Sequence, residues 1–189
     1  MCIRDRLLEE LKNLNRGALA EMRTLLIELR PSALIEANFG DLLQQLAEAA
    51  SGREGLPVEV EVDCACTLPP DVHIALYRIA QEALNNVVKH ARAGKAKVTV
   101  GCSHCSAGNF GEDRPRKVTL QVADDGQGFT QDRNQHDHLG LGIMRERAED
   151  IGAKIDFDSE PGGGTRITVQ WQEPEYHDGD HDLQVGDGS

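Results

Sequence analysis

The first periodic pattern along the chain covers residues 7–29 and predicts one long helix. Apolar residues recur there at steps of three and four, close to a heptad repeat with one extra four-residue step. The apolar positions are Leu7, Leu11, Leu14, Ala18, Met22, Leu25 and Leu29. We expect Pro31 to end the helix, because the residue before a proline avoids the helical region. The pattern leaves two interpretations open: a helix packed on its own domain, or a helix that pairs with a partner chain.

The remaining pattern predicts helices and strands that alternate. We expect a helix at about 38–51 that ends near Gly52, a strand at 57–63, a helix from about 70 to 91, strands at 95–100 and 117–122, a helix at 140–152, and strands at 154–159 and 165–171. Asp71 is expected as the N-cap or a first-turn acid of the longest of these helices. This order predicts an α+β fold, a two-layer α/β sandwich with a mixed sheet and helices on one face.

Polar residues are threaded through the end of the longest of these helices, in the segment "EALNNVVKHA". At the angular spacing of an α-helix, Glu82, Asn86, Lys89 and His90 fall within about 100° of one another, beside a broad apolar face. A solvated face with a Glu–Lys pair is one explanation of this stripe, and a functional site is the other.

Glycine clusters follow the same helix in a fixed order and favour the functional interpretation. In "DDGQG", Asp124 lies just beyond a buried strand, and Gly126 and Gly128 permit sharp turns and close approach of a flat ligand. In "HLGLGIM", Gly140 and Gly142 precede a helix whose free N–H groups suit phosphate. The cluster "PGGGT" joins the last two strands. Each cluster alone is weak evidence for a functional site, but the clusters in this order form a specific pattern.

Composition and charge limit the classes of protein. The 189 residues are 39% hydrophobic and 28% charged, as in soluble globular proteins. The net charge of −12 argues against a broad nucleic-acid surface, so we expect no direct nucleic-acid binding. Residues 173–189 carry six acids and no Lys or Arg, and we expect a disordered tail there. No apolar run approaches the ~20 residues of a membrane span. Five cysteines do not suggest a secreted disulfide framework, so we expect a reducing cytoplasm.

The motifs resemble those of sensor histidine kinases, within the gyrase–histidine kinase–MutL ATPase superfamily. "LYRIAQEALNNVVKHA" resembles the N box, "DDGQGF" the G1 box, and "GLGIMRERAEDIGAKIDFDSEPGGGTRITV" the G2 region with its closing hairpin. The subgroup resembled is the nitrate/nitrite-sensor-like one, whose partners are LuxR-type response regulators. The resemblance implies a Bergerat-type ATP-binding fold and the cofactors ATP and Mg²⁺.

The resemblance implies roles for the polar stripe. Asn86 matches the family's Mg²⁺ ligand, and an amide carbonyl oxygen suits that hard cation. Glu82 matches the catalytic carboxylate that polarises a hydroxyl or water, or assists the attacking imidazole. Lys89 and His90 match positions that face the phosphates.

The resemblance also implies roles for the later motifs. Asp124 matches the acid that accepts a hydrogen bond from the adenine amino group, and Thr165 the hydroxyl behind the adenine. Gly126 and Gly128 match the G1 glycines. Gly140, Leu141 and Gly142 match the lid hinge and the phosphate-side start of a helix. Residues 130–138 would be a short ATP lid.

Three segments follow from the resemblance. Residues 1–35, which include "ELRPSAL", resemble the second helix of a dimerisation and phosphoacceptor module, residues 36–172 an ATP-binding kinase catalytic domain, and residues 173–189 an acidic tail. No histidine precedes His73, which falls on the apolar arc of its helix and is expected to pack there. We therefore expect a chain truncated before its phosphoacceptor histidine, which another module supplies in cis or in trans, and a homodimer through residues 7–30. Its expected location is the cytoplasm, with a parent receptor that could be membrane-anchored.

Two other functional classes remain as alternatives. One is a nucleotide-binding interaction module or an anti-sigma-type serine kinase. The other is a zinc or redox site made by Cys64, Cys66, Cys102 and Cys105, if the strand end and the loop that carry them are neighbours. For these cysteines we expect unlinked thiols.

Overall fold

The computed structural model describes residues 31–63, 67–103, 116–130 and 139–174. Their elements, in chain order, are α2 (Pro31–Glu36), α3 (Phe39–Glu54), β1 (Val58–Asp63), α4 (Pro70–Asn86), the π-helix η1 (Val87–Ala91), β2 (Ala96–Ser103), β3 (Lys117–Asp124), α5 (Leu139–Asp150), β4 (Lys154–Glu160) and β5 (Gly164–Gln172). The expected helix at 7–29, the expected lid at 130–138 except Thr130, and the expected tail beyond residue 174 lie outside the described residues.

The strands form one mixed sheet in the order β1-β2-β3-β5-β4. Strand β1 pairs with β2 in parallel, and every other pair is antiparallel. The register sets Ala96 opposite Asp124, and Asp124 opposite Thr165 on the next strand. Asp124 is therefore the last residue of β3. The prediction that it lies just beyond the strand is wrong.

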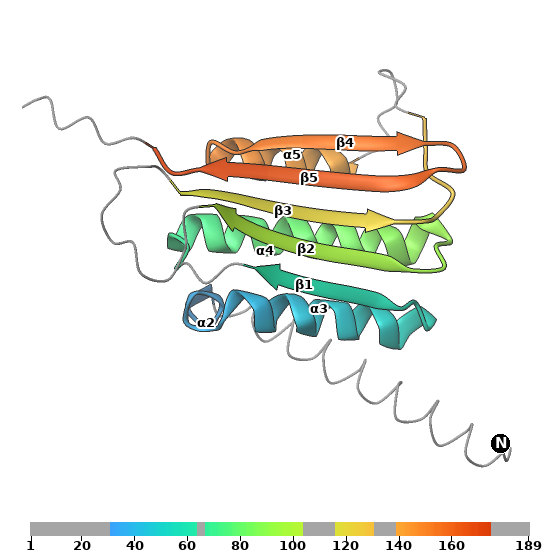
Figure 1. Cartoon of the computed structure of the whole chain (residues 1–189), viewed down its shortest axis with the longest axis horizontal. Helices are drawn as coiled ribbons and strands as arrows, with labels where there is room; N and C mark the ends of the chain where they lie inside the picture. The colour runs from blue at the N-terminus through green and yellow to red at the C-terminus, as the bar shows by residue number, and fades with distance from the viewer. Residues whose placement is uncertain (1–30, 64–66, 104–115, 131–138, 175–189) are drawn as a thin grey trace, which may run out of the picture.

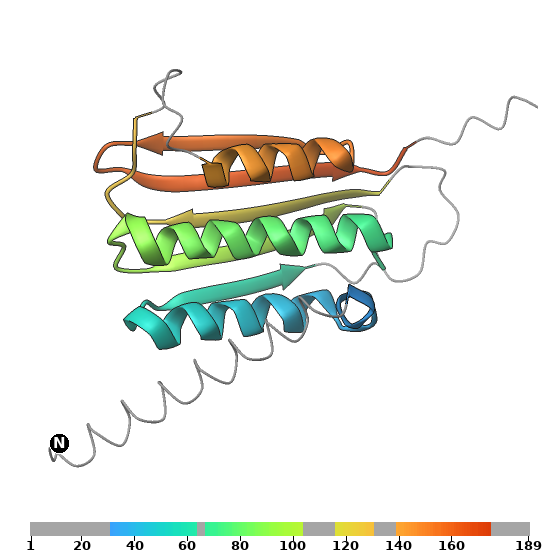
Figure 2. The ribbon, with the colours of Figure 1, turned by 180° about the vertical axis from the view of Figure 1, so that it is seen from behind.

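The helices cover one face of this sheet, as Figures 1 and 2 show from opposite sides. The strands alternate buried and less buried residues because successive side chains point to opposite faces. The buried set meets the apolar face of α4 in a single large cluster that includes Leu76, Ile79, Ala80, Val98, Val100, Leu120 and Val122. The expected two-layer sandwich with a mixed sheet is confirmed.

Helix α3 ends later than expected, and a short helix, α2, precedes it. Helix α3 begins after Asn38, whose side chain accepts hydrogen bonds from the N–H groups of Gly40 and Asp41. It continues through Gly52 and ends at Gly55, which has the positive φ of 67° that closes a helix. Pro31 begins the short helix α2. Proline is tolerated at this position because a residue in the first turn of a helix does not need to donate a backbone hydrogen bond. The side chain of Leu34 is buried in the main core, so the expected domain boundary at residue 35 falls inside a packed helix.

The longest helix reaches Ala91 as predicted, but its last turn is not α-helical. Residues 87–91 are π-wound, with hydrogen bonds from i to i+5, and the run ends at Arg92 with φ 51°. Such turns are rare and occur frequently at functional sites. The Asp71 side chain lies in the first turn, and the N-cap residue is Pro69.

Several single residues confirm or correct the sequence interpretation. His73 is buried, as expected for a packing residue. Glu173 is held by Arg116 and so does not belong to a disordered tail. Cys102 is disulfide-bonded, so the expectation of an unlinked thiol is wrong there. The other cysteines lie outside the described residues. No helix in the described ranges is long and apolar enough to cross a membrane.

Candidate functional site

A pocket of about 480 Å³ opens at the end of the sheet where α4 and η1 finish. Pockets for small ligands commonly have about 300–1,000 Å³. Of the residues expected at the site, the pocket is lined by Glu82, Asn86, Lys89, His90, Asp124, Gly128, Gly140, Leu141 and Thr165. Gly126 and Gly142 are not among its lining residues. The structure thus gathers side chains that the sequence spreads over more than 80 residues.

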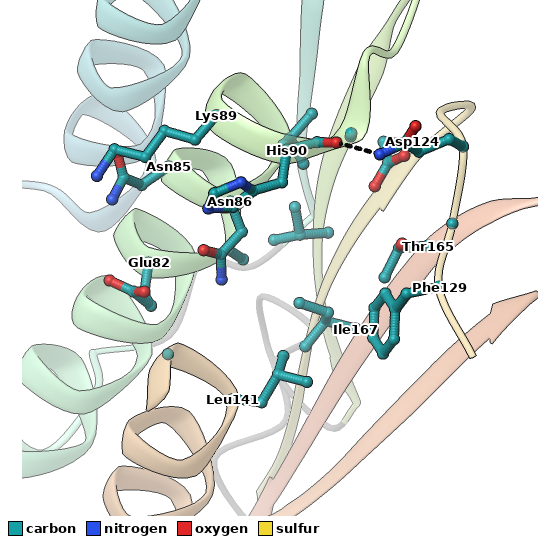
Figure 3. A pocket seen from close by; sticks show the side chains of 17 residues that line it. Glu82, Asn85, Asn86, Lys89, His90, Asp124, Phe129, Leu141, Thr165 and Ile167 are labelled. Atoms are coloured by element: carbon teal, nitrogen blue, oxygen red, sulfur yellow. Dashed lines mark hydrogen bonds between the residues drawn. The ribbon is translucent and has the colours of Figure 1, made fainter. Parts of the chain in front are cut away.

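The pocket has two chemically different sides (Figure 3). Asp124, Thr165 and Phe129 lie on one side. The residues of α4 and η1 line the other: Glu82, Asn85, Asn86, Lys89 and His90. Leu141 and Ile167 provide apolar surface between the two. The arrangement suits a ligand with a flat, largely apolar part at one end and a charged part at the other.

Asp124 is the principal polar group of the first side. Burial raises the pKa of its carboxyl, while the backbone N–H groups of Gly126 and Thr165 partly offset the shift by stabilising the charged form. The N–H of Gly126 donates to Oδ1 of Asp124 over 2.8 Å. These contacts fix the orientation of a half-buried carboxylate that can accept a hydrogen bond from a ligand amino group.

A hydroxyl network behind Asp124 was not predicted from the sequence. Oγ of Ser159 accepts from the N–H of Phe129 over 3.0 Å and donates to the carbonyl of Gly164 over 2.9 Å. The Thr165 hydroxyl lies 3.1 Å from the same oxygen. Because Ser159 has only one hydroxyl proton, Thr165 is the donor in that contact. The lone pairs of Thr165 then remain available on the pocket side.

The loop after β3 needs glycine because it runs against other backbone. A Cβ at Gly126 would overlap the carbonyl oxygen of Ala91, and one at Gly128 would overlap the carbonyl oxygen of Glu160. Gly128 also has a φ of 60°, which L side chains rarely adopt. The expected G1 glycines are therefore required by close packing of three segments, and Gly126 acts from outside the pocket.

The second side of the pocket meets the first turn of α5. A Cβ at Gly140 would overlap Oε1 of Glu82 and lie 3.2 Å from Nδ2 of Asn86, so this glycine lets α5 approach the two polar side chains. A Cβ at Gly142 would meet no described residue within 4 Å. Lys89 lies at the outer edge of the pocket, on the same side as Asn85 (Figure 3).

Asn86 is the group on this side that suits a divalent cation. Its amide oxygen is a hard ligand of the kind that Mg²⁺ accepts beside water and phosphate oxygens. Across the described ranges, no three His, Cys, Asp or Glu side chains converge on one point as a protein-only metal site would require. Coordination of Mg²⁺ through Asn86 stays a prediction.

The chain is similar to known proteins over the region that forms the pocket. The family described as histidine kinase-, DNA gyrase B-, and HSP90-like ATPase matches residues 71–175. The sensor histidine kinase LiaS of Bacillus subtilis is 34% identical over 151 residues, which cover 79% of this chain and 38% of that protein. The chain thus spans less than half the length of this relative.

Two solved structures share the fold. The blue-light activated histidine kinase of Erythrobacter litoralis EL346 aligns with a TM-score of 0.56 and 20% identity, over 88% of this chain and 58% of the other. The ATP-binding domain of PrrB from Mycobacterium tuberculosis aligns with a TM-score of 0.51 and 23% identity, over 73% and 96%.

Proposed function

Because this chain belongs to the family of histidine kinase-, DNA gyrase B- and HSP90-like ATPases and carries the ATP-binding domain of sensor histidine kinases, we propose that its pocket binds Mg·ATP and directs the γ-phosphate to a histidine of another module. The observation that carries the proposal is the two-sided pocket. One side offers a single oriented carboxylate, and the other offers two amides, a carboxylate, a lysine and a histidine.

The first side of the pocket suits adenine. The Asp124 carboxylate accepts a hydrogen bond from the exocyclic amino group, with the Thr165 hydroxyl beside it. Phe129, Leu141 and Ile167 supply apolar contacts to the flat ring. Guanine has a carbonyl where adenine has this amino group, so a carboxylate at this point disfavours it.

The second side suits the phosphates. Lys89 carries a positive charge at the pocket edge and His90 provides ring nitrogens, while the Asn86 amide oxygen would hold Mg²⁺, which neutralises phosphate charge when bound. Most of the catalysis then comes from positioning and charge neutralisation, as in other phosphoryl transfers.

Glu82 is the proposed catalytic carboxylate. In the transfer, the bond between the γ-phosphorus and the β–γ bridging oxygen breaks, and ADP leaves with the electron pair. A new phosphorus–nitrogen bond forms at an imidazole nitrogen of the acceptor histidine. Glu82 would orient that imidazole and accept the proton from its other nitrogen.

Neither histidine that the structure describes is placed to accept the phosphate. His73 is only 7% exposed and His90 lies in the pocket itself. We propose that a histidine-bearing dimerisation module supplies the acceptor in cis or in trans, that residues 7–30 contribute to a homodimer, and that a LuxR-type regulator receives the phosphate in the cytoplasm.

The test is transfer to a supplied acceptor. The chain is incubated with Mg²⁺ and ATP labelled in the γ-phosphate, together with a histidine-bearing dimerisation module or with a serine-bearing protein substrate. We expect acid-labile label on the histidine-bearing module, none on the chain alone, and strong loss with Glu82→Gln. Acid-stable label on the serine-bearing protein would instead support an anti-sigma-type serine kinase. No transfer to either acceptor, with ATP binding intact, would leave a nucleotide-dependent interaction module.

A further inference from the structure

The phosphate side of the pocket is built on the π-wound turn η1. Lys89 and His90 both belong to this turn, so the directions of their side chains depend on its winding. A π-turn is less favourable than the α-helix it replaces, and it persists only where other contacts hold it. Arg92, which follows it, has a φ of 51°, unusual for a residue with a side chain. The end of this helix therefore needs support from outside.

The support comes from the segment Asp124–Gly128, which we call the DDGQG loop. The side-chain Nε2 of Gln127 donates to the carbonyl of His90 over 2.9 Å, and the backbone N–H of Gln127 donates to the carbonyl of Ala91 over 2.8 Å. The Gln127 carbonyl in turn accepts from the N–H of Gly162 over 2.6 Å. Gln127 thus joins the final carbonyls of η1 to the β4–β5 hairpin.

Asp125 holds the residues that follow η1. Its Oδ1 accepts hydrogen bonds from the N–H groups of Gly94 and Lys95, over 2.8 and 2.9 Å. These two donors stabilise the charged carboxylate and lower the pKa of Asp125. Asp125 does not line the pocket, so these contacts do not depend on a ligand.

We propose that Asp125 and Gln127 are positioning residues that hold η1 in its π-wound form and so set Lys89 and His90 for the phosphates. This inference rests on the proposed function. The neighbouring Asp124 serves the base side from the same loop. The DDGQG loop therefore sets both sides of the pocket, with one residue that touches the base and two that act through the helix end.

The inference separates phosphate recognition from base recognition. Loss of Asp125 contacts should weaken the binding of ligands that carry phosphates and leave adenosine binding nearly unchanged. A residue that only stabilised the loop would weaken both, because the loop leaves β3 at Asp124 and its Gly126 N–H orients the Asp124 carboxylate. The ratio of ATP affinity to adenosine affinity thus distinguishes the two roles.

The experiment measures both affinities by calorimetry with Mg²⁺, for the wild type, Asp125→Ala and Asp125→Asn. We expect Asp125→Ala to bind ATP about tenfold more weakly, because two hydrogen bonds to a charged acceptor are lost, with adenosine affinity changed less than about twofold. Asp125→Asn keeps the Oδ1 acceptor and should restore most of the ATP affinity. Gln127→Met removes the side-chain donor to the His90 carbonyl without adding charge to the pocket, which Gln127 also lines, and should show a smaller change in the same direction. An equal loss for ATP and adenosine would overturn the inference and leave the proposed function standing.

Amide hydrogen exchange tests the same point without nucleotide. Asp125→Ala should speed exchange in residues 87–95 and leave α3 unchanged. Unchanged exchange in residues 87–95 would overturn the inference even if ATP affinity fell. If the wild type bound neither ATP nor adenosine, the proposed function would fail, and the exchange result alone would decide whether the loop holds η1.

Discussion

The two ends of the α4–η1 run carry one histidine each, and the contrast between them separates structure from function. At the first end, His73 is buried, with its ring edge-on to Phe39 at a centroid distance of 5.0 Å, and its Nε2 has no hydrogen-bond partner among the described residues. At the other end, His90 is exposed in the pocket, and its carbonyl is held by Gln127. The first end is closed by packing, whereas the second is built around space for a ligand.

The surroundings of the two ends differ in the same way. Near the first end, the guanidinium of Arg116 donates two hydrogen bonds to the carboxylate of Glu173 and one, over 2.9 Å, to the carbonyl of Thr67, just before α4. Near the second end, glycines let backbone segments approach each other and the ligand space. Substitutions at the first end should therefore change stability alone, and those at the second should change binding or activity as well.

The largest effect is expected at a glycine of the second end. Gly128→Ala combines a positive φ with an overlap against backbone oxygen that cannot move away. We expect the free energy of unfolding to fall by about 3 kcal/mol or more. Gly101→Ala is the matched control, because a Cβ there meets no atom of the described part of the chain within 4 Å and no positive φ is required. Urea unfolding of both variants gives the comparison, and an equal effect would contradict the close-packing argument.

The next largest effect concerns activity more than stability. Gly140→Ala would displace the Glu82 carboxylate and crowd Asn86, so we expect phosphoryl transfer to a supplied histidine to fall about 100-fold. The free energy of unfolding should change by less than about 1 kcal/mol, because the overlapped atom ends a flexible side chain. Gly142→Ala, two residues further along α5, should change neither quantity by a comparable amount. Equal loss of activity in the two variants would remove the special role given to Gly140.

A smaller effect is expected from the ion pair near the first end. Arg116→Met should lower the free energy of unfolding by about 1–2 kcal/mol. This range already allows for solvent screening, because 35% of the Arg116 side chain and 34% of the Glu173 side chain are exposed. ATP affinity should stay the same. Arg166→Met breaks the more exposed contact with Asp158, at 3.7 Å, and should cost close to nothing. A change in ATP affinity with Arg116→Met would show that the two ends are coupled.

The smallest effect is a pH dependence at His73. Burial lowers the pKa of this imidazole below its usual 6.5, so the unfolded chain takes up the proton more readily than the folded one. The free energy of unfolding should therefore fall as the pH drops below 6.5, by about 1 kcal/mol or less between pH 7 and pH 5.5. His73→Phe should remove this part of the acid sensitivity. The prediction fails if thermal unfolding of wild type and variant shows the same pH dependence.

The sequence predicted the elements well because most of them bury one face. Alternation in the strands and the apolar arc of α4 follow directly from that burial, and His73 was placed correctly by the same pattern. Asp124 and the glycines could be identified because their order along the chain is specific. Ser159 was missed, since its role depends on the pairing of β4 with β5 and not on any local pattern.

The helix ends were harder to predict. A helical wheel assumes a constant angle per residue, so it cannot represent the π-turn that carries Lys89 and His90. Gly52 and Gly55 are chemically identical, and only the backbone angle shows that Gly55 closes α3. Glu173 was grouped with an acidic tail by composition, whereas its partner Arg116 is distant in sequence. For the π-turn and for Glu173, the deciding contacts come from residues distant in sequence.

The central claim is that the second end of α4 is a nucleotide site with a base side and a phosphate side. Calorimetry of Mg-dependent ATP binding, on the wild type beside Asp124→Asn and Asn86→Ala, tests it most directly. The account predicts that the wild type binds, that Asp124→Asn loses preference for adenine, and that Asn86→Ala loses the dependence on Mg²⁺. The account is contradicted if the folded wild type does not bind ATP. It is also contradicted if Asp124→Asn and Asn86→Ala change the preference for adenine and the dependence on Mg²⁺ to the same extent.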